Sequence, residues 1–232
     1  MKKINHWLKR FPNIWKTILF NFYYLPFKQA VRLPIFIGNR IIIKSLGSRN
    51  SVFVNNSLTR GSISLGIGNG SYEKGKNEYS YWEIDNNGII KFNGTCQISK
   101  GFRIHVRDGA ILEIGNGFSA NANSLICCDE NIAIGDGCML GWNVSLMDTD
   151  LHRLYNEKNE YYNQPSPIHI GDFVWIASDS TILKGCCIGS KNVIAKSAVV
   201  SKQTTTRNCL LAGNPAVIVK ENINWSRDLC KG

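Results

Sequence analysis

The chain has 232 residues, 44% of them hydrophobic and 19% charged, which is the composition of a folded protein of one or two domains. Its formal net charge of +10 has one source, because residues 1–49 contain ten Lys or Arg and no Asp or Glu. The rest of the chain is close to neutral, so the charge does not indicate a nucleic-acid-binding protein.

Residues 1–46 form a basic arm that is rich in aromatic residues. The apolar run over residues 14–25 predicts a short helix that ends at Pro26, because proline cannot continue a helix. Stacked repeats need a cap over their open end, so the arm either caps the fold alone or also contacts a membrane surface. A platform for single-stranded nucleic acid is the least favoured alternative, and we expect no nucleic-acid partner.

A ladder of large aliphatic residues, one at every sixth position, runs from residue 170 to residue 200. Its members are Ile170, Ile176, Ile182, Ile188, Ile194 and Val200. A period of six fits neither a helix nor an ordinary strand, whereas a parallel β-helix turns a corner about every six residues and completes a three-sided coil in about 18. Four residues after most members comes a small or slim residue that suits a corner. These are Ser180, Cys186, Asn192 and Ala198.

The same spacing runs upstream from residue 84 to residue 146, with a shift of two near residue 132. The next positions of the count are polar, beginning with His152, and the ladder returns at Ile170. We therefore predict that residues 151–167 are a loop ejected from the solenoid. Long loops of this kind in compact domains are usually functional.

These patterns predict an all-β solenoid with three parts. Residues 1–46 are the helical arm, residues 47–219 the β-helix with its loop, and residues 220–232 a tail expected to form a short helix that closes the other end.

Eight cysteines are present, but the adjacent pairs Cys127/Cys128 and Cys186/Cys187 make poor bridging geometry. We interpret them as reduced packing residues and expect a cytoplasmic protein, associated with the inner face of the membrane if the arm binds lipid. We expect no signal peptide and no membrane-spanning segment. Because no Cys-x-x-Cys pair occurs, we also expect no metal site.

Three motifs carry a resemblance. They are Asp148-Thr149-Asp150-Leu151-His152, Ile170-Gly171-Asp172-Phe173-Val174-Trp175-Ile176 and Ala212-Gly213-Asn214-Pro215-Ala216. Together with the ladder, they resemble the hexapeptide-repeat acyltransferases, above all the bacterial O-acetyltransferases of surface polysaccharides and sugars. The resemblance implies a left-handed parallel β-helix, a homotrimer, and acetyl-CoA bound between neighbouring subunits.

The resemblance also places the catalytic base at His152. An imidazole can take the proton of an acceptor hydroxyl and return it to the CoA thiolate, and it works best when a carboxylate orients it. Asp150 and Asp148 are both candidates for that carboxylate, with Asp150 favoured. The zinc-binding branch of the same fold needs three histidines, and the spacing of His105, His152 and His169 does not suit it.

The remaining site residues follow from the same resemblance. The backbone amide of Ser178 is the expected oxyanion donor, Trp175 would wall the site, and Asn143 could hydrogen-bond the acceptor. The residues expected near CoA lie further along the chain. They are Ala177, Ala195, Lys196, Lys202, Gly213, Asn214, Pro215 and Lys220. Ala177 and Ala195 stand where the family usually has glycine.

The predicted function is acetyl-CoA-dependent transfer of an acetyl group to a sugar hydroxyl of a surface polysaccharide or its precursor. One alternative is an N-acetyltransferase for an amino sugar on the same scaffold, because an amine acceptor needs a similar base. The other is a solenoid without catalytic activity that binds glycan or membrane, against which His152 at the mouth of the loop argues.

Overall fold

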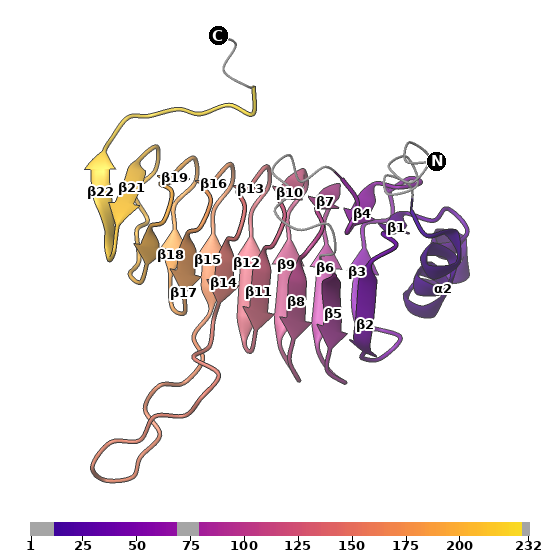
Figure 1. Ribbon diagram of the computed structural model, residues 1–232, viewed down its shortest axis with the longest axis horizontal. Helices are drawn as coiled ribbons and strands as arrows, with labels where there is room; N and C mark the ends of the chain where they lie inside the picture. Colours follow the sequence, from indigo (N-terminus) through magenta and orange to yellow (C-terminus); the bar gives the residue numbers. More distant parts are fainter. Residues whose placement is uncertain (1–11, 69–78, 229–232) are drawn as a thin grey trace, which may run out of the picture.

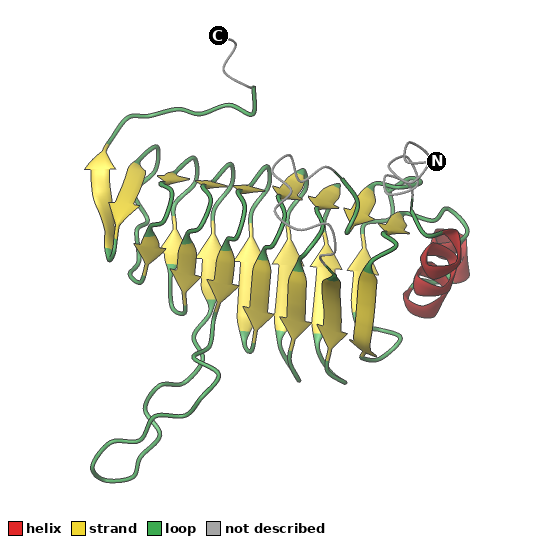
Figure 2. Cartoon of the chain, viewed as in Figure 1, coloured by secondary structure: helices red, strands yellow, loops and turns green. Residues whose placement is uncertain are grey.

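The structure is a computed structural model that describes residues 12–68 and 79–228. Over these ranges the chain winds into a parallel β-helix whose strands form three sheets, so that each coil contributes one strand to each side of a prism (Figure 1). The helices are confined to the N-terminal end and the rest is strand and loop (Figure 2).

The nine-stranded sheet contains Trp175. Its order is β1 (Ile35–Ile37), β4 (Ile63–Leu65), β7 (Cys96–Ile98), β10 (Phe118–Ala120), β13 (Met139–Leu140), β16 (Trp175–Ile176), β19 (Val193–Ile194), β21 (Leu210–Gly213) and β22 (Ala216–Lys220). All neighbours in it are parallel except β21 and β22, which form an antiparallel hairpin.

The other two sides are wholly parallel. The seven-stranded sheet contains β2 (Ile41–Leu46), β5 (Ser80–Ile84), β8 (Arg103–Val106), β11 (Leu125–Cys128), β14 (Ser145–Met147), β17 (Thr181–Leu183) and β20 (Val199–Val200). The six-stranded sheet contains β18 (Cys187–Ile188), β15 (Ile168–Ile170), β12 (Asn131–Ile134), β9 (Ile111–Ile114), β6 (Ile89–Phe92) and β3 (Val52–Val54).

The predicted ladder is the core of the prism. All six aliphatic side chains from Ile170 to Val200 are at most 4% exposed, and the four small corner residues are fully buried. Burying such a side chain contributes about 1.5–3 kcal/mol, and here each one stacks on its equivalent in the next coil. This part of the prediction is confirmed.

The coil length was predicted correctly only for the C-terminal coils. Register partners are 18 residues apart between Ile176 and Ile194, but 20 apart between Ala120 and Leu140 and 22 apart between Cys96 and Phe118. The N-terminal coils carry extra residues in their turns, because a corner tolerates insertions that leave the inward-facing strand residues in place.

Helix α2 (Ile14–Tyr24), followed by the short α3 (Phe27–Ala30), covers the free edge of β1. The Asn21 side chain pairs with both the amide and the carbonyl of Ile35, and the Thr17 hydroxyl accepts the Ile37 amide. The edge strand therefore has its backbone groups satisfied by side chains of the helix. The first coil begins at β1, so the boundary predicted at residue 47 lies about ten residues too late.

The predicted C-terminal helix is not present in residues 220–228. The alternating β-branched run of β22 pairs with β21, and beyond it the chain is extended and runs back along the coils (Figure 1). Its side chains contact earlier coils: the Trp225 indole donates to the Phe173 carbonyl at 2.7 Å, and Arg227 contacts β10. These long-range contacts, together with a left-handed backbone at Asn222, override helix formation.

The described cysteines form no disulfide, and all except Cys187 are buried. Burial raises the pKa of the thiols of Cys138 and Cys186 to about 11, which suits packing residues. Neither described helix is long and apolar enough to cross a bilayer.

Candidate active site

The loop that contains His152 leaves the solenoid after β14 and returns at β15, so it spans residues 148–167. Asp148 opens it from a fully buried position, and its carboxylate accepts the backbone amides of Asp129 at 2.7 Å and Glu130 at 2.9 Å. Burial raises the pKa of Asp148, and the amides that bind the ionised form oppose that shift. Asp148 thus holds the turn between β11 and β12 against the base of the loop.

Asp150 is exposed and belongs to a separate polar cluster. Its carboxylate accepts the ammonium group of Lys184 and, at 2.7 Å, the side-chain amide of Asn163. These two hydrogen bonds, that from Lys184 first, lower the pKa of Asp150. Because this pKa lies below its value in the unfolded chain, the pair stabilises the loop above about pH 4, and that contribution disappears as the pH falls through the folded pKa.

His152 follows directly and projects into solvent. Its backbone amide donates to the Asp150 carbonyl at 2.7 Å, and its carbonyl accepts the Asn163 side-chain amide at 2.9 Å. The residue before it, Leu151, has φ +63°, a conformation that costs a side-chain-bearing residue of order 1 kcal/mol or more. The backbone of His152 is therefore clamped, while its imidazole stays accessible.

A second cluster lies at the corner between the nine-stranded and seven-stranded sheets. The Ser178 hydroxyl accepts the Trp142 amide at 3.1 Å, and within the described residues the Ser178 amide itself donates no hydrogen bond. Asn143 of the preceding coil donates to Asp179, which also pairs with Lys196 of the following coil. This corner thus presents an uncommitted backbone donor beside a chain of polar side chains.

Trp175 lies half-buried on the outer face of β16, the strand that leads into the corner at Ser178. The ring of Trp225 from the C-terminal segment packs against it, with 6.0 Å between ring centroids and 42° between the planes. Two aromatic rings therefore wall this part of the nine-stranded sheet.

The residues predicted to contact CoA all lie on this side or toward the C-terminal end. Ala177 and Ala195 occupy equivalent positions in successive coils, and the Ala177 amide donates to the Ile194 carbonyl at 2.9 Å. Gly213 ends β21, and Asn214 and Pro215 form the exposed turn before β22, with a cis peptide between them. Lys202 follows β20 and Lys220 ends β22, and both are exposed.

The two clusters do not meet within one chain. The loop leaves the corner between the seven-stranded and six-stranded sheets, whereas Trp175 lies on the nine-stranded sheet, the side of the prism opposite that corner. In Figure 1 the loop projects from the lower edge, while β13, β16 and β19 line the upper edge. One chain therefore presents two candidate half-sites, the loop and the corner at Ser178, on different sides.

Three residues near these half-sites were missed by the sequence analysis: Asn163, Lys184 and Trp225. The register could have indicated Lys184. Leu183 pairs with Met147, 36 residues earlier, so Lys184 lies one coil beyond Asp148, near the base of the loop. No local pattern marks Asn163 or Trp225. Among the described residues, no group of three or more His, Cys, Asp or Glu could hold a metal ion.

A parallel β-helix whose repeat gives way to a loop with an accessible histidine, two and four residues after aspartates, has the architecture of a solenoid acyltransferase. Comparisons with known proteins give the particular family. No family model matches the chain. A polysialic acid O-acetyltransferase of Neisseria meningitidis is 31% identical over 196 residues, which are 83% of each chain.

A galactoside O-acetyltransferase of Escherichia coli (strain K12) is 35% identical over 115 residues, 49% of this chain and 55% of that protein. The crystal structure of the polySia specific acetyltransferase NeuO has a TM-score of 0.64 at 25% identity, over 83% of this chain and 92% of that one. The chain belongs to the hexapeptide-repeat O-acetyltransferases and is an acyltransferase with their left-handed parallel β-helix.

Proposed function

We propose that this protein transfers the acetyl group of acetyl-CoA to a hydroxyl of a sugar in a surface polysaccharide or its precursor. The observation that supports this proposal most directly is the position of His152. It lies near the start of the loop at residues 148–167, and the Asn163 side chain holds its backbone in place. The named acceptors of the related enzymes, polysialic acid and galactosides, support a saccharide substrate.

In the proposed reaction, His152 takes the proton of the acceptor hydroxyl as the oxygen attacks the thioester carbonyl. The tetrahedral intermediate then collapses, the C–S bond breaks, and the imidazolium returns the proton to the CoA thiolate. The amide of Ser178 suits the oxyanion, because a donor with no other partner among the described residues needs no reorganisation as the charge develops.

Asp148 and Asp150 have different roles in the proposed site. Both carboxylate oxygens of Asp148 accept backbone amides, so Asp148 holds the base of the loop. Asp150 shares the Asn163 side-chain amide with the His152 carbonyl, which makes it a positioning residue for the base.

The separation of the half-sites supports a homotrimer in which the loop of one copy reaches the corner of the next. His152 of one copy would then face Trp175, Ser178 and Asn143 of its neighbour. The small side chains of Ala177 and Ala195 leave room for the pantetheine arm beside the turn at residues 213–215, and Lys196, Lys202 and Lys220 supply positive charge for the phosphates.

Mixing two inactive variants tests this arrangement. His152→Ala and Trp175→Ala trimers, dissociated and reassociated together, are expected to regain thiol release from acetyl-CoA, because some mixed interfaces then combine two intact half-sites. A mixture of His152→Ala with His152→Gln should stay inactive. Failure of the first mixture to recover activity would exclude a site shared between copies.

The stability of the product to alkali distinguishes the two kinds of acceptor. Alkali-labile products identify esters, and alkali-stable products would instead identify the amides of an N-acetyltransferase.

The outward face of helix α2 supports contact with an anionic membrane surface. Its polar residues Thr17 and Asn21 point inward, while Ile14, Trp15 and Leu19 are each 69–76% exposed. A helix that also exposes large apolar side chains, within a segment that carries ten basic residues and no acidic ones, suits the interface of an anionic bilayer.

Substituting Trp15 and Leu19 together with glutamate is expected to abolish sedimentation of the protein with phosphatidylserine vesicles. Neither side chain packs in the core, so thermal stability should be retained. The matched control is Phe53→Glu, an exposed apolar residue on β3 that should leave vesicle binding unchanged. Equal vesicle binding by the double variant and the wild type would exclude membrane contact through helix α2 and leave the arm only its role as a cap on the first coil.

A further inference from the structure

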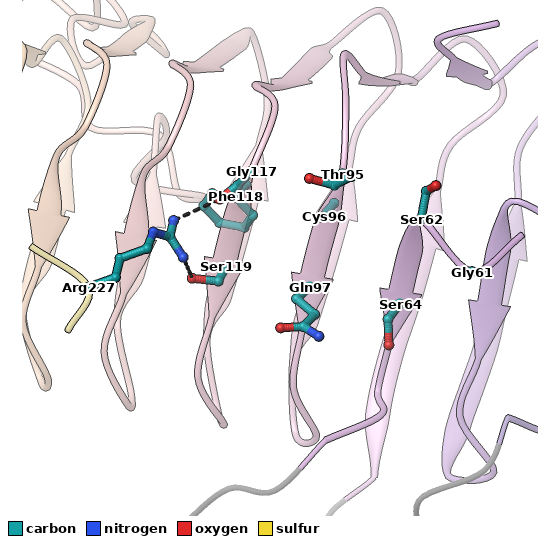
Figure 3. A pocket seen from close by; sticks show the side chains of 10 residues that line it. All are labelled: Gly61, Ser62, Ser64, Thr95, Cys96, Gln97, Gly117, Phe118, Ser119 and Arg227. Carbon is teal, nitrogen blue, oxygen red and sulfur yellow. Dashed lines mark hydrogen bonds between the residues drawn. The ribbon is translucent and has the colours of Figure 1, made fainter. Parts of the chain in front are cut away.

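A shallow polar cavity of about 300 Å³ lies on the outer face of the nine-stranded sheet, two coils away from Trp175 toward the N-terminus (Figure 3). It is formed at β4, β7 and β10, and most of its side chains are hydroxyls or amides. Its polar side chains include Ser64, Thr95, Gln97, Ser119 and Arg227. Hydroxyl and amide groups on a solvent-facing sheet can donate hydrogen bonds to a sugar and accept them from it.

The one charged group of the cavity comes from the C-terminal segment. The Arg227 guanidinium donates to the Ser119 hydroxyl at 2.9 Å and to the Gly117 carbonyl at 2.7 Å, as the dashed lines in Figure 3 show. It also contacts the carbonyls of Gly137 and Cys138, both at 3.0 Å. Among the described residues no ion pair involves Arg227, and the four hydrogen bonds of its guanidinium all go to neutral oxygens. A carboxylate is the ligand that a guanidinium held in this way favours.

The cavity and the reacting end of the site lie along one row of the sheet. Ser64, Gln97, Ser119, Met139 and Trp175 are successive register partners, and all of them point outward. Strands are spaced by about 4.8 Å, so the row from Trp175 reaches Ser119 after about 10 Å and Ser64 after about 19 Å. This distance exceeds one sugar ring, so a group in the cavity would belong to a different residue of the acceptor from the one being acetylated.

The C-terminal segment contacts both ends of the part of this row between Trp175 and Ser119. Trp225 packs on Trp175 and donates to the Phe173 carbonyl, and two residues later Arg227 reaches the cavity. The residues proposed for CoA lie in the opposite direction, toward β21 and β22, which leaves the N-terminal side of Trp175 to the acceptor.

We propose that this cavity is a distal subsite that binds a carboxylate-bearing residue of an oligosaccharide or polysaccharide acceptor, with Arg227 pairing with the carboxylate and Gln97 and Ser119 contacting sugar hydroxyls. The proposal rests on the proposed function, because it takes Trp175 as the reacting end. It narrows the acceptor to an acidic chain of several residues and assigns a specificity role to the C-terminal segment.

Binding of acidic oligomers to the full-length protein without acetyl-CoA tests the subsite by titration calorimetry. The probes are the dimer and octamer of sialic acid, the octamer of galacturonic acid, and each octamer with its carboxylates reduced to alcohols. We expect at least one octamer to bind about 10-fold more tightly than a dimer, since a hydrogen bond to a charged group changes affinity by about that factor. Reducing the carboxylates of that octamer to alcohols should remove the gain in affinity. Failure of both octamers to show a gain that depends on carboxylates would overturn the proposal.

Two variants separate the subsite from the attachment of the segment. Arg227→Gln removes the charge, and Gln97→Glu adds a negative charge on β7 without touching the segment. Both should lose the octamer gain, whereas Arg103→Gln, an exposed arginine on the seven-stranded sheet, should keep it. If Arg227→Gln weakens binding and Gln97→Glu does not, the effect comes from release of the segment and the subsite is excluded. Thiol release with any acceptor is measured separately, so an inactive enzyme would count against the proposed function and not against the subsite.

Discussion

Replacing His152 with alanine is expected to lower acetyl transfer by at least about 100-fold, the effect of removing a general base. The side chain makes no packing contact that the fold needs, because it lies in solvent and only its backbone is held by Asn163 and Asp150. Thiol release from acetyl-CoA at saturating acceptor measures the loss in kcat. The KM for acetyl-CoA should change little, since none of the residues proposed for CoA lies in the loop that carries His152.

The matched control is His169→Ala, an exposed histidine on the outer face of β15 that should retain wild-type activity. Asn163→Ala should give an intermediate loss, because it releases the clamp on the His152 backbone and leaves the imidazole present. Wild-type activity in His152→Ala would falsify the assignment of the base and move the search to the corner at Ser178.

Replacing Trp82 with alanine is expected to lower the free energy of unfolding by about 3–5 kcal/mol, the range for deleting a large aromatic from a core. Trp82 is among the largest fully buried side chains, and its ring lies 5.2 Å from that of Phe20 in an edge-to-face arrangement. Its indole also donates to the Tyr24 hydroxyl at 3.2 Å. The substitution therefore leaves a cavity beneath helix α2 and weakens the cap on the first coils.

Urea denaturation followed by circular dichroism measures this loss, and hydrogen exchange of residues 14–24 should show that the helix opens before the C-terminal coils. Trp82→Phe is the control, because it keeps an aromatic ring and loses only the hydrogen bond and some volume. Equal losses for the two substitutions would mean that the hydrogen bond to Tyr24, and not the packing, holds the helix in place.

How much could be read from the sequence differs between the fold and the site. The ladder from Ile170 to Val200 gave the β-helix, because inward-facing positions recur at a fixed spacing and must be apolar wherever they occur. The same count located the loop, since His152 occupies a position where a solenoid would need an aliphatic residue. The 20-residue and 22-residue coils were missed, because residues added at corners change the spacing without changing the inward pattern.

What the sequence by itself determined is the repeating architecture and the place where it is interrupted, since both depend on the chemistry of each residue at its own position. Tertiary structure alone decided which distant residues meet. Stacked coils bring Lys184 to Asp150, and the returning C-terminal segment brings Arg227 to Ser119, 108 residues earlier. It also decided that His152 and Trp175 lie on different sides of the prism. Such contacts depend on how the coils stack and on the path of a segment without periodicity. No local sequence pattern predicts either of these.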